Sequence, residues 1–125
     1  MKRLQSISKA YEYNKDRHTA YMHSARADEL DVQWYQSPQW RRLSSQIHVI
    51  DLYTCRICGH VQLPNETMVT DHIIPRRTAP ELAMTASNLW LLDRTCHNKK
   101  TAIERKRTPE QLKIMTRDEW IRLLE

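Results

Sequence analysis

Apolar positions in residues 37–50, SPQWRRLSSQIHVI, recur at the spacing of an α-helix. Ser37 is a favourable N-cap, and Pro38 suits the first helical position because its missing N–H would have no partner there. One apolar stripe follows at offsets of 3, 7 and 10 positions, and its members are Trp40, Leu43, Ile47 and Ile50. We therefore predict an amphipathic helix whose stripe, Trp40 included, belongs to the core.

Residues 67–74, TMVTDHII, instead alternate and are rich in β-branched side chains. This pattern predicts a strand, which Pro75 should end because proline has no N–H to pair. After the loop RRTAPELAMTAS, the run NLWLL at residues 88–92 predicts a second short strand or a turn.

The two ends of the chain read as helical. Residues 1–33 are polar and rich in helix formers, and we predict an N-terminal helical arm there. In residues 108–125 we expect one short helix from Thr108, and a last one in which Thr116 and Glu119 form a capping box. These C-terminal helices should pack on a central domain of residues 34–107.

Composition limits the classes of protein that fit. A chain of 125 residues with 40% hydrophobic side chains makes one domain with a small core. Gly59 is its only glycine, which excludes a Walker loop and a dinucleotide fingerprint. Three cysteines without a signal peptide indicate a reducing compartment, the cytoplasm, and no apolar run is long enough to span a membrane.

The positive charge is concentrated in one segment. Residues 94–107, RTCHNKKTAIERKR, hold six basic side chains and only Glu104 as an acid, a balance of +5 that equals the net charge of the whole chain. We expect a helix from Thr95, as N-cap, to about Arg107. Such a segment indicates a surface that faces DNA or RNA, although a merely solvated helix face is the alternative.

Two pairs of residues with identical spacing suggest a zinc site. Cys55 and Cys58 are separated by two residues, as are Asp93 and Cys96. Paired knuckles of this kind can hold zinc tetrahedrally, and zinc accepts a carboxylate oxygen beside thiolates. His60 is a rival fourth ligand. The alternative is three unrelated cysteines that serve as small hydrophobes. A bound zinc would stabilise a domain with little core.

Asp71, His72, Asn88 and His97 form a second group of candidate functional residues. Hydrolysis of a phosphodiester needs a general base for water, a cation near the phosphoryl oxygens and a group that orients the base. Neighbours on a regular strand point to opposite faces, so Asp71 and His72 can share one site only where the strand ends or bulges. Otherwise they are a surface acid and a packed imidazole.

These motifs as a set resemble the HNH endonuclease family of the ββα-metal fold. CRIC, DHIIP, NLWLL and CHNKKT occur in the family's order, with 16 positions from His72 to Asn88 and 9 from Asn88 to His97. The resemblance covers about residues 34–107, and the lead-in WYQSPQWRRL is similar to the form found in small phage endonucleases. It implies an α+β fold: a ββα-metal core with a zinc knuckle pair, between the helical arm and the C-terminal helices.

The resemblance also implies roles for single residues. His72 would be the general base that activates water, and Asn88 would brace the loop and orient His72. Asp71 and His97 would bind a catalytic divalent metal (Mg²⁺, Mn²⁺, Ni²⁺ or Zn²⁺). The structural zinc would be held by Cys55, Cys58, Asp93 and Cys96. The residues expected to contact the phosphate backbone of DNA are Arg76, Lys99, Lys100 and Arg105.

The sequence departs from the family's pattern at two positions. Asp93 replaces the usual third cysteine, which affects the zinc site but not the catalytic group. Arg76 stands where many relatives have a histidine, and we expect it to contact phosphate instead. The function implied is a metal-dependent nuclease of double-stranded DNA in a bacterial cytoplasm, and analogy extends it to phage packaging beside the terminase. The alternative is a zinc-stabilised DNA-binding module without catalysis.

Overall fold

The computed structural model describes residues 29–125, so the predicted arm of residues 1–33 lies mostly outside the described part. The chain forms two compact units, Met1–Arg41 and Arg42–Glu125, and each is described by itself. In the described part of the first unit, residues 29–35 are helical. The rings of Trp34, Tyr35 and Trp40 cluster there, with centroids 4.9 to 5.6 Å apart.

Helix α3, Pro38–Ile50, begins where the sequence predicts it to begin. The Ser37 hydroxyl accepts a hydrogen bond from the Trp40 backbone N–H at 3.3 Å, as an N-cap does. Of the predicted stripe, Trp40 and Ile47 are buried, whereas Ile50 is 65% exposed. The prediction for Ile50 is wrong because the helix ends at this residue and the chain turns away.

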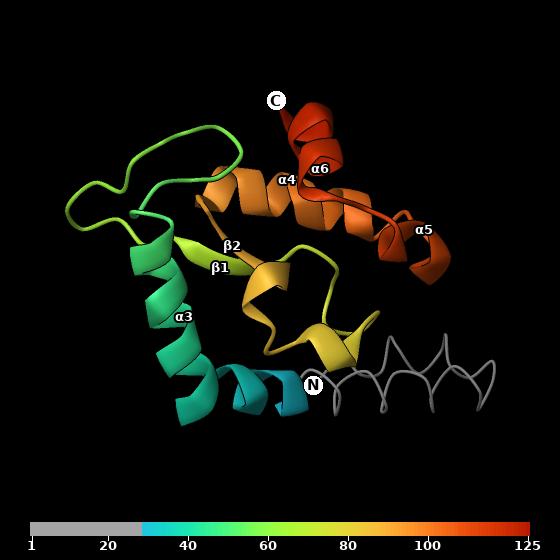
Figure 1. The fold of residues 1–125 in the computed structure, drawn as a ribbon, viewed down its shortest axis with the longest axis horizontal. Helices are drawn as coiled ribbons and strands as arrows, with labels where there is room; N and C mark the ends of the chain where they lie inside the picture. Colours follow the sequence, from blue (N-terminus) through green and yellow to red (C-terminus); the bar gives the residue numbers. More distant parts are fainter. Residues whose placement is uncertain (1–28) are drawn as a thin grey trace, which may run out of the picture. The chain divides into compact units, whose positions relative to one another are not determined.

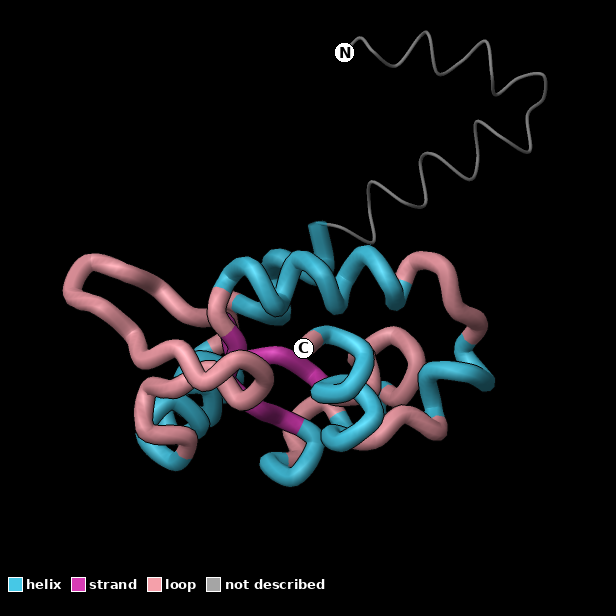
Figure 2. Tube along the Cα trace, turned by 90° about the horizontal axis from the view of Figure 1, so that it is seen from above, coloured by secondary structure: helices cyan, strands magenta, loops and turns pink. Residues whose placement is uncertain are grey.

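The second unit is built around a two-stranded antiparallel sheet, β1 Val69–His72 and β2 Leu89–Leu92 (Figures 1 and 2). Asp71 lies opposite Trp90, and His72 lies opposite Leu89. The strand pattern predicted β1 over residues 67–74, but pairing stops at His72. The chain bends after this residue, three positions before Pro75. The short 3₁₀ helices Pro80–Leu82 and Ala86–Asn88 lie in the connection to β2.

Three helices complete the unit: α4 Arg94–Glu104, α5 Pro109–Lys113 and α6 Arg117–Leu124. The N-cap of α4 is Asp93, whose carboxylate accepts from the Cys96 backbone N–H at 2.7 Å. The prediction of Thr95 as N-cap is therefore wrong by two positions. Capping boxes begin both α5, at Thr108, and α6, where the predicted pair of Thr116 and Glu119 is confirmed.

The core lies between the sheet and the helices. α4 contacts both strands and also α6, which crosses beside it in Figure 1. Leu91, Leu92 and Trp120 are completely enclosed. Other members of the same apolar cluster come from α5, from α6 and from the segment between them, namely Leu112, Leu124 and Met115. No helix in residues 29–125 is long and apolar enough to cross a membrane.

Two hydrogen bonds join the loop between α3 and β1 to the backbone of β2. The Arg56 N–H donates to the Leu91 carbonyl at 2.9 Å, and the Leu91 N–H donates to the Asp51 carboxylate at 2.9 Å. Gly59 has a φ of +81°, which glycine adopts without strain. This turn places Cys55 and Cys58 beside the end of β2, where α4 begins.

Candidate metal and catalytic sites

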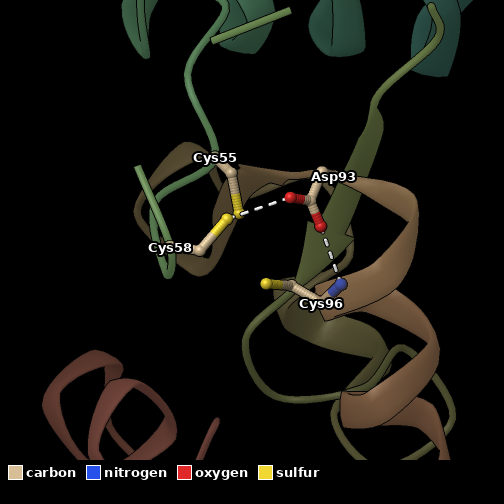
Figure 3. Close-up of side chains that lie close together, drawn as sticks. All are labelled: Cys55, Cys58, Asp93 and Cys96. Carbon is tan, nitrogen blue, oxygen red and sulfur yellow. Dashed lines mark hydrogen bonds between the residues drawn. The ribbon is translucent and has the colours of Figure 1, made fainter. Parts of the chain in front are cut away.

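The two knuckles meet at one point. One ligand atom from each of Cys55, Cys58, Asp93 and Cys96 lies within 4.8 Å of every other (Figure 3). One oxygen of the Asp93 carboxylate accepts a hydrogen bond from the Cys58 thiol at 2.9 Å. The other oxygen accepts one from the Cys96 backbone N–H. Ligands around a zinc ion stand about 3.4–3.8 Å apart, so the group needs only small adjustments to hold one.

The donor chemistry of this cluster also fits a dication. Burial raises the pKa of the Cys96 thiol far above its usual range, and Cys55 nearby adds to the rise. Burial raises the pKa of Cys58 as well, and so does its hydrogen bond to Asp93. Burial acts to raise the pKa of Asp93 too, but hydrogen bonds from Cys58 and Cys96 outweigh it and hold that pKa low. Without a cation the raised pKa values keep Cys58 and Cys96 protonated, and metal binding would release these protons.

His60, the rival fourth ligand, is engaged elsewhere. Its Nε2 lies 2.9 and 3.0 Å from the two oxygens of the Glu66 carboxylate. It is absent from the group of converging ligands, which contains Asp93 instead. The carboxylate at the third knuckle position therefore completes the cluster in place of a cysteine.

Asp71 and His97 come together from β1 and α4. Asp71 Oδ1 lies 3.6 Å from His97 Nε2, and the two side chains are 7% and 28% exposed. This separation is too long for a direct hydrogen bond but short enough for both atoms to reach one ion with bonds of about 2.1 Å. His97 Nδ1 is buried and has no hydrogen-bond partner in the part of the chain that the structure describes. Burial lowers the pKa of His97, which keeps the ring neutral, as a metal ligand must be.

The other Asp71 oxygen is fully occupied by protein donors. Oδ2 accepts from Trp90 Nε1 at 2.9 Å and lies 3.0 Å from the ammonium of Lys100. Trp90 is directly opposite Asp71 in the sheet, so the register itself brings its indole to the carboxylate. One oxygen is held by the fold, and the other faces His97.

His72 is buried at the end of β1, where the strand stops as a shared site requires. Its Nε2 lies 3.0 Å from the Ala83 carbonyl. A carbonyl can only accept, so the neutral ring carries its hydrogen on Nε2 and keeps Nδ1 as the basic nitrogen. Burial lowers the pKa of His72, although the Ala83 carbonyl and the Asp71 charge oppose this. The imidazole is thus neutral near pH 7.

Asn88 fixes the bend that follows His72. Its Oδ1 accepts from the Ile74 N–H and its Nδ2 donates to the Ile74 carbonyl, both at 3.0 Å. Its own backbone carbonyl accepts from the Ile73 N–H at 2.8 Å. The side chain acts on the backbone beside His72 and is buried there. This paired amide contact is what ends the strand.

Four basic residues were predicted to contact DNA, and the structure corrects one of them. Lys100 is completely buried, with its ammonium bonded inside the protein, so it cannot contact a phosphate from solution. The prediction for Lys100 is wrong because it lies on the face of α4 that packs on β1. Lys99 and Arg105 are exposed and Arg76 is half-buried. For these three, DNA contact stays a prediction.

Several residues of the site escaped the sequence patterns. Trp90 read only as part of an apolar run, and Glu104 only as the single acid of a basic segment. The Ala83 carbonyl carries no sequence signal at all, since any residue has one. The spacing of His97, Lys100 and Glu104 by three and four positions places them on one helix face. This spacing is the sequence signal that indicates Lys100 and Glu104 lie near His97.

Comparison with known proteins gives a family match for one segment of the chain and a similar fold. Residues 55–102 match the family model described as HNH endonuclease, and this segment of the chain is an HNH domain, as the motifs predicted. The fold resembles the crystal structure of the HNH endonuclease of the deep-sea thermophilic bacteriophage GVE2 with manganese ion. The TM-score is 0.57 and the identity 24%, over 70% of this chain and 95% of that one. No curated protein sequence matches the chain significantly.

Proposed function

We propose that this protein is a divalent-metal-dependent endonuclease that hydrolyses phosphodiester bonds of double-stranded DNA. The observation that carries the proposal is the 3.6 Å approach of Asp71 Oδ1 to His97 Nε2, next to the buried imidazole of His72. The match to the HNH endonuclease family supports it, and so does the manganese ion of the phage endonuclease structure. A protein that only binds DNA has no need of this arrangement.

His72 is the general base of the proposed reaction. Its Nδ1 takes a proton from water, and the resulting hydroxide attacks the phosphorus in line with the bond to the 3′ oxygen. That bond breaks, the leaving 3′ oxygen takes a proton from solvent water, and the products carry 5′-phosphate and 3′-hydroxyl ends. The Ala83 carbonyl holds the tautomer and Asn88 holds the backbone, so the ring keeps its orientation.

Asp71 and His97 would hold the divalent ion in this proposal. When bound, the ion supplies positive charge to the phosphoryl oxygens and to the leaving 3′ oxygen. The two protein ligands leave most positions around it for water and phosphate, which a catalytic site requires. Oxygen and nitrogen ligands suit Mg²⁺, Mn²⁺, Ni²⁺ or Zn²⁺.

The cysteine cluster would hold a structural zinc ion. It joins the loop before β1 to the first turn of α4, the helix that carries His97. Zinc there would fix the start of α4 relative to β1, and thus His97 relative to Asp71. The exposed Lys99 and Arg105, with Arg76 beside the site, would contact the DNA backbone without reading its sequence.

We extend the proposal to the biological setting by analogy with the phage neighbour. The protein would act in the cytoplasm of a bacterial host, alongside the terminase that packages phage DNA. Co-purification of the protein with a terminase from infected cells would support this role. Absence of the protein from terminase complexes would contradict the proposed role in packaging but would leave the nuclease proposal unchanged.

A plasmid-nicking assay with Mg²⁺, Mn²⁺ or Ni²⁺, against EDTA, tests the nuclease function. The parent protein should nick with at least one metal and stop with EDTA. His72→Ala should lower the rate by about 10²–10⁴-fold, the usual contribution of a general base. Its melting temperature and DNA affinity should stay near those of the parent.

His48→Ala is the matched control, because His48 is half-buried on α3 and belongs to neither site. It should nick at close to the parental rate. Equal nicking by His72→Ala and the parent would remove His72 from the mechanism. DNA binding without metal-dependent nicking by the parent would identify a zinc-stabilised binding module instead.

A further inference from the structure

Lys100 is a buried cation that contacts two residues of the proposed catalytic site, Asp71 and His72. It is completely enclosed, although lysine is almost never fully buried without a partner. Its ammonium donates to the His72 carbonyl at 2.8 Å and to the Glu104 carboxylate, and it lies 3.0 Å from Asp71 Oδ2. Three N–H groups thus meet three acceptors. The Trp120 ring covers the ammonium at 4.5 Å from its centroid.

Two of these three acceptors belong to the pair of residues on which the proposed chemistry depends. Together with Trp90 Nε1, the Lys100 ammonium holds Asp71 Oδ2, which restrains the carboxylate and leaves Oδ1 directed at His97. By holding the His72 carbonyl, it fixes the backbone from which the imidazole projects. Lys100 also lies three positions after His97 on α4. The same helix therefore carries the proposed metal ligand His97 and the lysine that holds Asp71.

Building on the proposed function, we propose that Lys100 is a positioning residue for the endonuclease reaction. It assigns the two oxygens of Asp71 to different tasks, Oδ2 to the protein and Oδ1 to the divalent ion. It also joins the end of β1 to α4 at the point where base and metal ligand must keep a fixed relation. Glu104 balances the buried charge and anchors the ammonium from the far side.

Lys100→Met tests this role, because methionine keeps the length of the side chain and removes the donor. We expect kcat for plasmid nicking to fall by about 10–100-fold, the range for residues that orient metal ligands. The KM for DNA should stay unchanged. Mn²⁺ affinity, measured by electron paramagnetic resonance without DNA, should weaken by a similar factor.

Leu112→Ala is the control for a merely structural effect. Leu112 lies on α5, is buried in the core cluster and is a member of neither site, and its truncation lowers stability through a cavity. At a temperature where both variants are folded, Leu112→Ala should keep the parental kcat and Mn²⁺ affinity. Should Lys100→Met fail to fold, the variant Lys100→Met/Glu104→Gln removes the stranded negative charge as well. It should show the same loss of kcat and Mn²⁺ affinity.

Parental kcat and Mn²⁺ affinity in either folded Lys100 variant would overturn the inference, since the buried lysine would then serve stability alone. A parent protein that neither nicks DNA nor binds Mn²⁺ at Asp71 would overturn the proposed function itself. The two failures are therefore distinguishable: the first leaves an active parent, and the second leaves none.

Discussion

Asp93 illustrates how one residue can join local structure to a metal site. One of its oxygens caps α4 by accepting from the Cys96 N–H, while the other faces the Cys58 thiol. A cysteine at this position could bind zinc but would cap the helix poorly, because sulfur is a weak acceptor. The Asp93 carboxylate caps the helix and also lies among the possible metal ligands, so it is suited to both tasks.

Two substitutions separate these tasks of Asp93. Asp93→Asn keeps an oxygen for the cap but removes the anionic ligand, whereas Asp93→Ala removes both. With zinc present, both variants should melt below the parent, and Asp93→Ala should be less stable than Asp93→Asn by about 0.5–2 kcal/mol, the cost of a lost cap. Thermal unfolding measures both differences.

Removal of zinc by a chelator supplies the control for Asp93. After zinc removal, the parent and Asp93→Asn should have similar melting temperatures. Asp93→Ala should still melt at a lower temperature than both. A parent whose melting temperature is unaffected by the chelator would show that this cluster holds no stabilising metal.

The residues of the site differ in how far the sequence could reveal them. Asp71, His72, Asn88 and His97 form a motif at fixed spacings, and the fold brings Asp71 to His97 as that motif implies. The sequence predicts an exposed Lys100 because charged side chains usually lie at the surface. The Lys100 side chain is buried because it lies on the face of α4 that packs on β1. The partners of His72 and Asn88 are backbone groups, which leave no trace in a sequence pattern.

At the scale of elements, side-chain caps correctly predicted the starts of α3 and α6. The caps at Ser37 and Thr116 depend only on residues within four positions of each other in the sequence. Helices α3 and α6 therefore begin where the sequence predicts. The strand β1 ends earlier than its apolar pattern because Asn88, distant in sequence, holds the backbone of Ile74. Helix α4 starts two residues earlier than predicted because the Asp93 carboxylate caps it by accepting from the Cys96 N–H.

Helix α6 contacts the residues around the proposed catalytic site through the side chain of Trp120. The indole is completely buried, donates to the Ile73 carbonyl at 3.0 Å and covers the Lys100 ammonium. Trp120→Ala should lower the free energy of unfolding by about 3–5 kcal/mol, the usual cost of truncating a buried aromatic side chain. Urea denaturation measures this change.

Leu123→Ala is the control for Trp120→Ala, because Leu123 lies on the same helix and is 45% exposed. It should alter stability far less. A similarly small loss in Trp120→Ala would show that α6 does not belong to the cooperative core.

Across the whole molecule, a small core is compensated by polar and ionic links. The sheet has two strands of four residues each, too few to be stable alone. The cysteine cluster fastens the loop before β1 to α4, and the Asp71–Lys100–Glu104 network fastens β1 to the same helix. Both connections hold α4 in place, and α4 carries His97.

The sequence predicted this class of fold from its motifs and their order, and the likeness to the solved phage endonuclease fold confirms it. It could not predict how β1, α4 and α6 would enclose a lysine, since that depends on packing between segments distant in the chain. The basic excess of residues 94–107 remains a sound indication of a polyanion partner, although Lys100 contributes its charge inside the protein.

The central claim is that Asp71 and His97 share one divalent ion beside His72. A crystal of the protein soaked in Mn²⁺, with diffraction data collected at the manganese absorption edge, tests it most directly. The account predicts an anomalous peak bonded to Asp71 Oδ1 and His97 Nε2, and its loss in Asp71→Ala. Manganese bound elsewhere, with direct contact between Asp71 and His97 in a protein that still nicks DNA, would contradict it.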